Sequence, residues 1–128
     1  MKSKKLSPDV FEDHRGVILS FPLDVNDSPV VEYNLIITLK GDERGYHYHP
    51  HFDEYMIVVD GECLFKEFSS DGDHKEMIMR EGDSIKIPTG TAHTFTALTD
   101  FKFVSLLTKR WDDSVPPIVK VNNNGEPL

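Results

Sequence analysis

Three of the six histidines of this 128-residue chain lie within five positions, in the segment GYHYHPHFDEYMIVVDGE at residues 45–62. A buried imidazole is costly unless its nitrogens find partners, and three such rings in an apolar, strand-like segment need a common solution. One metal ion satisfies several imidazoles at once. The cluster therefore indicates a metal site, and the rest of the chain contains residues that would complete it.

His47 and His49 are two residues apart, the spacing at which strand side chains share a face with their backbones roughly 6.6 Å apart. Imidazoles at this spacing converge on an ion at ~2.0–2.1 Å. Glu54 has the wrong parity for that face, but a proline interrupts the strand, and we expect a bend to bring Glu54 back on the next strand. His93, just after the turn at residues 88–90, is the expected fourth ligand. This donor set suits one divalent first-row metal, such as zinc, iron, manganese or nickel.

Short apolar segments separated by turn sequences dominate the chain, without a convincing helical period. Alternation over residues 31–39 predicts a half-buried strand, and the D-G-E sequence at residues 60–62 is typical of a tight hairpin. Further strands are expected at Val17–Phe21, Tyr55–Asp60, Cys63–Ser69, Lys75–Met79, Ser84–Ile87, His93–Ala97 and Phe101–Thr108. About nine strands at this spacing predict an all-β sandwich or barrel.

Length and composition limit the possible classes of function. The chain is long enough for one domain, with a barrel expected over about residues 15–110 and an arm or loose tail over residues 112–128. A net charge of -8 argues against a general nucleic-acid binder. Cys63 is the only cysteine, and we read neither a secretory signal nor a membrane span of ~20 apolar residues in the sequence. We expect a cytoplasmic protein that binds neither nucleic acid nor membrane.

Two motifs in the chain resemble those of the cupin superfamily. The patterns G-x5-H-x-H-x4-E-x6-G and G-x5-P-x-G-x2-H are matched by Gly41, His47, His49, Glu54 and Gly61, and by Gly82, Pro88, Gly90 and His93. The asparagine that commonly follows the second motif is Ala97 here, a change that removes no ligand. The resemblance implies a jelly-roll β-barrel, a metal held by the three histidines and the glutamate, and a homodimer. We expect the N-terminal strand or the apolar segment at residues 115–119 to cross between subunits.

Two shorter segments resemble nucleotide-sugar enzymes. Residues 13–16 and 44–47 look like the D-x-R-G and R-G-x-H segments of dTDP-4-dehydrorhamnose 3,5-epimerases and dTDP-sugar 3,4-ketoisomerases. The R-G-x-H-x-H form is also similar to the metal-containing cupin domain of capsular-polysaccharide sugar reductases. The resemblance implies that Arg15 and Arg44 hold the diphosphate of a nucleotide sugar, because guanidinium matches phosphate oxygens. The opposing interpretation of each arginine is a surface ion pair with a neighbouring acid.

The expected metal changes how such a reaction would run. In the metal-free epimerases the histidine of R-G-x-H acts as the base, but a metal-bound His47 has no free nitrogen for a proton. The metal would instead polarise a keto oxygen and stabilise an enediolate, while an unligated neighbour moves the proton. His51, beside the ligands, is the leading candidate for the proton carrier, and Tyr55 is the candidate acid. The opposing interpretations are a surface histidine on the bend and a packing role for the tyrosine.

The sequence therefore predicts an epimerase or isomerase that acts on a keto-sugar, with a nucleotide-linked sugar as its small-molecule substrate. Two other classes fit the same metal site: an iron-dependent dioxygenase and a binding or sensing cupin without turnover. The arginine segments favour the isomerase. An aromatic-lined, uncharged pocket would favour the dioxygenase, and a closed metal site would favour the binding protein.

Overall fold

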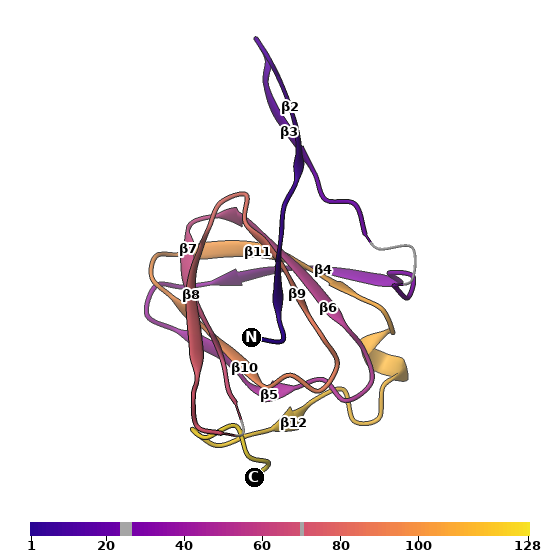
Figure 1. The fold of residues 1–128 in the computed structure, drawn as a ribbon, viewed down its shortest axis with the longest axis vertical. Coiled ribbons are helices and arrows are strands. Elements are labelled where there is room, and N and C mark those ends of the chain that lie inside the picture. Colours follow the sequence, from indigo (N-terminus) through magenta and orange to yellow (C-terminus); the bar gives the residue numbers. More distant parts are fainter. Residues whose placement is uncertain (24–26, 70) are drawn as a thin grey trace.

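Two five-stranded antiparallel sheets face each other, and a separate hairpin projects away from them (Figure 1). The computed structural model describes residues 1–23, 27–69 and 71–128. The strand orders are β1-β9-β6-β11-β4 and β12-β5-β10-β7-β8. The elements are β1 (Lys4–Leu6), β2 (Asp9–Asp13), β3 (Gly16–Ser20), β4 (Glu32–Thr38), β5 (Glu43–Tyr48), β6 (Glu54–Asp60), β7 (Glu62–Glu67), β8 (Lys75–Arg80), β9 (Ser84–Ile87), β10 (His93–Ala97), β11 (Phe101–Leu107), the 3-10 helix η1 (Trp111–Asp113) and β12 (Val119–Lys120). This nearly all-β architecture confirms the predicted jelly-roll class.

The core lies between the two sheets and follows the period-two alternation of their strands. Met56 and Val58 of β6 are buried, whereas the intervening Ile57 is only partly so. They pack in one cluster with Cys63, Phe65, Met79, Ile85, Ile87, Phe95, Ala97, Phe101 and Phe103. Burial raises the pKa of the Cys63 thiol to about 12. In the described ranges, no helix has the length and hydropathy that a membrane span requires.

The first and last strands of the barrel differ from those that the sequence predicts. The predicted strand at Val17–Phe21 exists as β3, but it pairs with β2 in the projecting hairpin instead of joining the barrel. The barrel instead begins with β1, which pairs with β9. The C-terminal residues are not a loose tail, because β12 pairs with β5. Local alternation predicts that a strand forms, but its partner is set by contacts between distant segments.

Two apolar surfaces remain uncovered. In the described part of the chain, β2 and β3 pair with each other only, and their exposed side chains include Val10, Phe11, Val17, Ile18 and Leu19. The strand β4 is the edge of its sheet, and its outer face exposes Val31, Tyr33, Leu35, Ile37 and Leu39. These ten side chains are 38–78% exposed. Each surface amounts to roughly 500 Å² of accessible area, the size of the largest patch on a typical monomer, and the two together come close to one side of a standard interface.

We expect a homodimer in which the hairpin of each copy covers the β4 surface of the other. Leu35→Lys and Ile18→Lys each place a charge in one of the two surfaces, so both should shift the mass toward the 14.6 kDa of one chain. Light scattering at micromolar concentration measures the mass. Ile78→Lys is the matched control, because Ile78 is an exposed isoleucine on β8. A wild-type mass of one chain, or a mass unchanged by both substitutions, would contradict this expectation.

Candidate metal centre

A bulge in β5 sets which of its side chains face the interior. Opposite β10, the register passes from His93↔His47 to Thr94↔Gly45, so Tyr46 is the extra residue. Gly45 has a φ of 111°, and a Cβ there would lie 2.7 Å from the carbonyl oxygen of His93. Glycine is therefore required where β5 approaches β10 most closely. The bulge places His47 directly across from His93.

The structure brings the three predicted histidine ligands together. One nitrogen each of His47, His49 and His93 lies within 4.8 Å of the other two. The ring centroids are 4.7 Å apart for His47 and His49, and 5.1 Å apart for His47 and His93. His49 is 4% exposed and His93 is fully buried. Two separate motifs thus meet at one point in the interior.

Hydrogen bonds fix the tautomers of the two buried rings. The Nδ1 atom of His49 lies 3.1 Å from the Pro117 carbonyl oxygen, and that of His93 lies 2.8 Å from the Thr91 carbonyl oxygen. Because a carbonyl only accepts, each Nδ1 carries the proton, and each neutral ring keeps a lone pair on Nε2. Both Nε2 atoms are buried without a hydrogen-bond partner. Such orphaned lone pairs are the ligand atoms that a metal ion requires, so these residues fit one.

Glu54 faces the same two nitrogens. Its Oε1 atom lies 3.3 Å from Nε2 of His49 and 3.7 Å from Nε2 of His93, and its Oε2 atom accepts a 2.5 Å hydrogen bond from Ser105. Burial raises the pKa of Glu54, but the hydrogen bond from Ser105 and any positive charge on His49 or His93 outweigh burial and bring the pKa to about 2. A carboxylate oxygen that faces two lone pairs needs a positive charge between them. The arrangement is therefore suited to a cation.

The histidines border a cavity of about 400 Å³, a usual size for a small-molecule site. His47, His49, Glu54 and Ser105 form part of its wall. The other lining residues are Asn34, Glu43, Arg44 and Gly45, together with the apolar Ile36, Phe95, Phe103, Leu107 and Trp111. The histidine cluster thus borders a cavity whose lining includes three aromatic side chains and one guanidinium.

Arg44 reaches this cavity because of the bulge. Strict alternation would turn Arg44 and His47 to opposite faces of β5, but the extra residue between them restores a common face. Arg44 pairs with Phe95 across the ladder. Its guanidinium donates to Thr38 Oγ1 at 2.8 Å and to the Ile37 carbonyl at 3.0 Å. The predicted substrate residue is therefore held in place at the cavity wall.

Arg15 is not at the cavity of its own chain. It lies at the tip of the projecting hairpin, where its guanidinium pairs with Asp13 at 2.5 Å and its side chain is 75% exposed. The ion-pair interpretation is the one that the structure supports. The short D-x-R-G segment forms the hairpin turn, which explains its aspartate and glycine without a ligand.

The two predicted catalytic residues also lie outside the cavity lining. His51 is exposed on the bend, and its Nε2 donates to the Val115 carbonyl at 2.9 Å. Tyr55 follows Glu54 on β6 and therefore points to the opposite face of that strand. There its hydroxyl donates to Asp27, and burial and this hydrogen bond raise its pKa to about 12. Their proton-transfer roles stay predictions, which this placement does not support.

Other cavity residues were not predicted from the sequence. Ser105 occupies an inward position of β11 between the buried Phe103 and Leu107, and a polar residue at a core position was the available signal. Trp111 lines the cavity with its ring centroid 6.2 Å from that of His49. The Pro117 carbonyl left no signal, because any residue supplies one.

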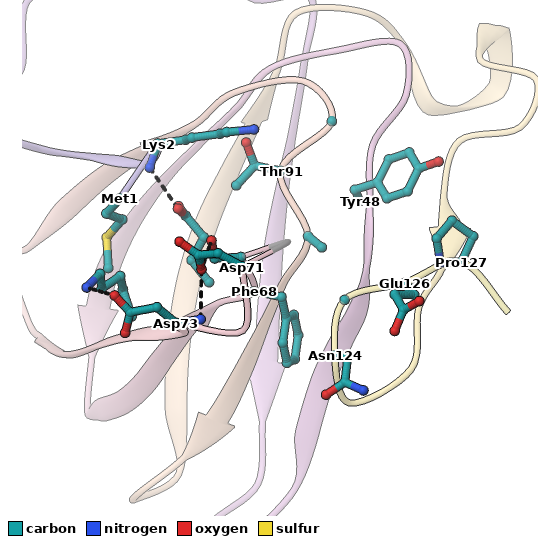
Figure 2. A pocket seen from close by; sticks show the side chains of 16 residues that line it. Met1, Lys2, Tyr48, Phe68, Asp71, Asp73, Thr91, Asn124, Glu126 and Pro127 are labelled. Carbon is teal, nitrogen blue, oxygen red and sulfur yellow. Dashed lines mark hydrogen bonds and ion pairs between the residues drawn. The ribbon is translucent and has the colours of Figure 1, made fainter.

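A second cavity, of about 680 Å³, shares no lining residue with the first (Figure 2). Three of its charged groups already have partners: Glu67 accepts from the backbone N–H groups of Lys2 and Ser3, and Asp73 pairs with Lys75. The histidine-lined cavity, with its unpartnered nitrogens, is the better candidate site.

The metal-free protein should lose stability as the pH falls below about 6.5. Burial, then the neighbouring His93 and His49, lower the pKa of His47 to about 3, and burial lowers that of His93. In the unfolded chain both histidines titrate near pH ~6.5. Their neutral rings therefore stabilise the folded state fully above that pH, and this stabilisation is lost as the pH falls toward the lower pKa values of the folded protein. Urea denaturation from pH 7.5 to 4.5 with chelator present measures this.

His47→Gln should flatten this pH dependence, whereas His14→Gln should leave it parallel to that of the wild type. His14 is the matched control because it is exposed at the hairpin turn. Parallel curves of unfolding free energy against pH for the wild type and His47→Gln would contradict the lowered pKa of His47.

Comparison with known sequences supports the motif analysis. The model of the cupin domain matches residues 34–107. The chain is 39% identical over 88 residues to the uncharacterized protein YdbB of Bacillus subtilis, with 69% of this chain and 67% of that protein covered. It is 31% identical over 90 residues to a protein of Saccharolobus solfataricus named "Putative dioxygenase SSO1533". That match covers 70% of this chain but only a fifth (20%) of the length of the relative.

Solved structures with the same fold include sugar-nucleotide enzymes. The 3'-monoepimerase ChmJ of Streptomyces bikiniensis, in complex with dTDP-quinovose, has a TM-score of 0.81 at 21% identity, with 94% of this chain and 70% of that chain covered. A 3,4-ketoisomerase of Helicobacter canadensis has a TM-score of 0.79 at 19% identity and 94% and 91% coverage. The dTDP-4-dehydrorhamnose 3,5-epimerase of Sulfolobus tokodaii has a TM-score of 0.76 at 25% identity and 100% and 81% coverage. The matched domain and both motifs establish that this chain belongs to the cupin domain family.

Proposed function

We propose that this protein is a metal-dependent enzyme that moves a proton next to the carbonyl group of a small anionic sugar, as epimerases and isomerases do. The observation that carries the proposal is that three histidines converge and that two of them, His47 and His49, line one cavity together with Arg44. A metal site alone would suit many reactions, but a fixed guanidinium beside it selects an anionic ligand.

His47, His49 and His93, with Glu54 beside them, would hold one divalent ion such as zinc, iron, manganese or nickel. The unpartnered Nε2 atoms of the two buried rings support this assignment. When bound, a divalent ion supplies Lewis-acid polarisation of a carbonyl oxygen.

Arg44 would bind the negative charge of the substrate. The cavity of about 400 Å³ has room for a sugar ring, so the diphosphate of a nucleotide sugar would lie at the mouth. The sugar-nucleotide epimerases and ketoisomerases that share this fold support a nucleotide-linked substrate.

Transfer of the substrate proton requires a side chain that is not one of the proposed metal ligands. Among the described lining residues, Glu43 is the one carboxylate besides Glu54, and Arg44 is a permanent cation. Glu43 is exposed at the start of β5, next to the arginine. We assign the proton transfer to Glu43.

A second candidate function is an iron-dependent dioxygenase. Two observations favour it: the aromatic lining formed by Phe95, Phe103 and Trp111, and the 31% identity to a relative named as a dioxygenase. Oxygen consumption with iron(II) is the property that separates it from the isomerase.

We expect the purified protein to contain about one divalent metal per chain. His93→Ala should lose most of this metal, because His93 supplies a buried lone pair that a methyl group cannot replace. His14→Ala, on the exposed hairpin, should retain it. Elemental analysis of protein prepared without added metal measures the content. Equal content in wild type and His93→Ala would remove His93 from the site.

A 4-keto nucleotide sugar in heavy water should exchange hydrogen next to its ketone, as followed by NMR. Glu43→Gln should slow the exchange by about two decades or more while retaining the metal. Arg44→Ala should weaken substrate binding by about one to two decades, as expected for a lost hydrogen bond to a charged group worth ~1.5–3 kcal/mol. Metal-free protein should show no exchange.

Unchanged exchange in Glu43→Gln would transfer the proton role to another group. Absence of exchange in the metal-loaded wild type, together with oxygen consumption when iron(II) is present, would replace the isomerase with the dioxygenase.

A further inference from the structure

The residues from 111 to 121, here called the C-terminal arm, dock against β5, which carries His47 and ends just before His49. Within the arm, β12 pairs with β5 in the register Val119↔Tyr48 and Lys120↔His47. The Val121 amide donates to the Tyr46 carbonyl at 2.8 Å. The arm thereby fills the edge of β5 that β10 leaves open. In Figure 1 it runs along the barrel beside β5.

The arm also supplies the acceptor that orients His49. The Pro117 carbonyl lies 3.1 Å from Nδ1 of this ring, which is 4% exposed. If the arm leaves, the Nδ1–H group loses this acceptor, and the ring is free to rotate or to change its tautomer. Rotation turns the Nε2 lone pair away from the position in which it faces Nε2 of His93 and the Glu54 carboxylate, and a change of tautomer places a proton on Nε2.

The first turn of the arm closes the cavity. The Trp111 indole lines it, 6.2 Å from the ring of His49 and 6.4 Å from that of Phe52. The backbone N–H of Trp111 donates to Glu32 Oε1 at 3.1 Å, which fixes this turn beside β4. One segment therefore provides both an orienting hydrogen bond for a ligand and a wall of the cavity.

The far end of the arm is anchored in a small apolar cluster of its own. Val121 is 3% exposed and packs with Phe68 and Ala92, against Tyr46 and Tyr48. This cluster is separate from the main core and contains none of the histidines. The anchor can therefore be weakened without a change in any ligand.

We propose that the C-terminal arm is part of the metal centre, so that docking of the arm and binding of a divalent metal strengthen each other. The proposal rests on the metal site proposed above. Because the two equilibria are linked, the factor by which the docked arm raises metal affinity equals the factor by which metal stabilises docking. Loss of a group that orients a metal ligand typically costs about 10–100-fold in affinity, which sets the expected size.

The first test compares metal affinity in two variants with the same type of change. Val121→Asp places a carboxylate in the anchor, and Leu128→Asp places one at a position that is 85% exposed. Competition with a chromogenic chelator gives the zinc affinity of each. We expect Val121→Asp to bind zinc about 10–100-fold more weakly than wild type, and Leu128→Asp to match the wild type.

The second test uses the wild type alone and applies even if Val121→Asp does not fold. Hydrogen exchange is followed with zinc and with chelator at the amides of residues 119–121, which the docked arm protects. Zinc should slow exchange there by at least about tenfold, and amides of the projecting hairpin β2–β3 should not change.

The outcomes separate this proposal from the proposed function. No zinc binding by the wild type would overturn both the metal site and the coupling. Zinc binding with unchanged exchange in the arm, or with equal affinity in Val121→Asp and wild type, would overturn the coupling and leave the metal site intact.

Discussion

The cavity depends on a bulge in β5, which has one residue more than the facing strand β10. Because Tyr46 has no partner on β10, the alternation of side chains reverses between Arg44 and His47, and both face the interior. A regular strand would place the guanidinium on one face of the sheet and the imidazoles on the other. Gly45 makes the bulge possible, since its positive φ and the nearby His93 carbonyl leave no room for a side chain.

Without a cation, the polar groups that this arrangement buries reduce the stability of the folded state. His49 and His93 each bury a nitrogen lone pair without a donor, and Glu54 turns a carboxylate oxygen toward both. Each unsatisfied buried polar atom costs about 1–3 kcal/mol, so a core selected for stability alone would not contain this cluster. A fold tolerates such a local conflict where a ligand resolves it.

The grouping of the three histidines with Glu54 could be predicted because its signals are local. Strand parity relates His47 to His49, and the two motifs supply the glycines and proline that turn Glu54 and His93 toward them. The fold class followed from the same alternation. The position of Arg15 depended on a longer-range fact, because Arg15 lies on a hairpin that leaves the barrel. Tyr55 could have been placed from local parity, since it follows Glu54 on β6 and takes the opposite face. The bulge and the backbone carbonyls that orient the rings have no side-chain signature, so sequence patterns do not reveal them.

Because Cys63 is buried, the reactivity of its thiol reports how often the core of this chain opens. The thiol is fully buried among Phe65, Met79 and other core residues, and its pKa of about 12 leaves almost no thiolate at neutral pH. An alkylating reagent therefore reacts only when the two sheets separate at this point. With a single sulfhydryl group present, the labelling rate reports these opening events, and because Phe95 and Phe103 belong both to this core and to the cavity wall, a ligand that stabilises the closed state should slow it.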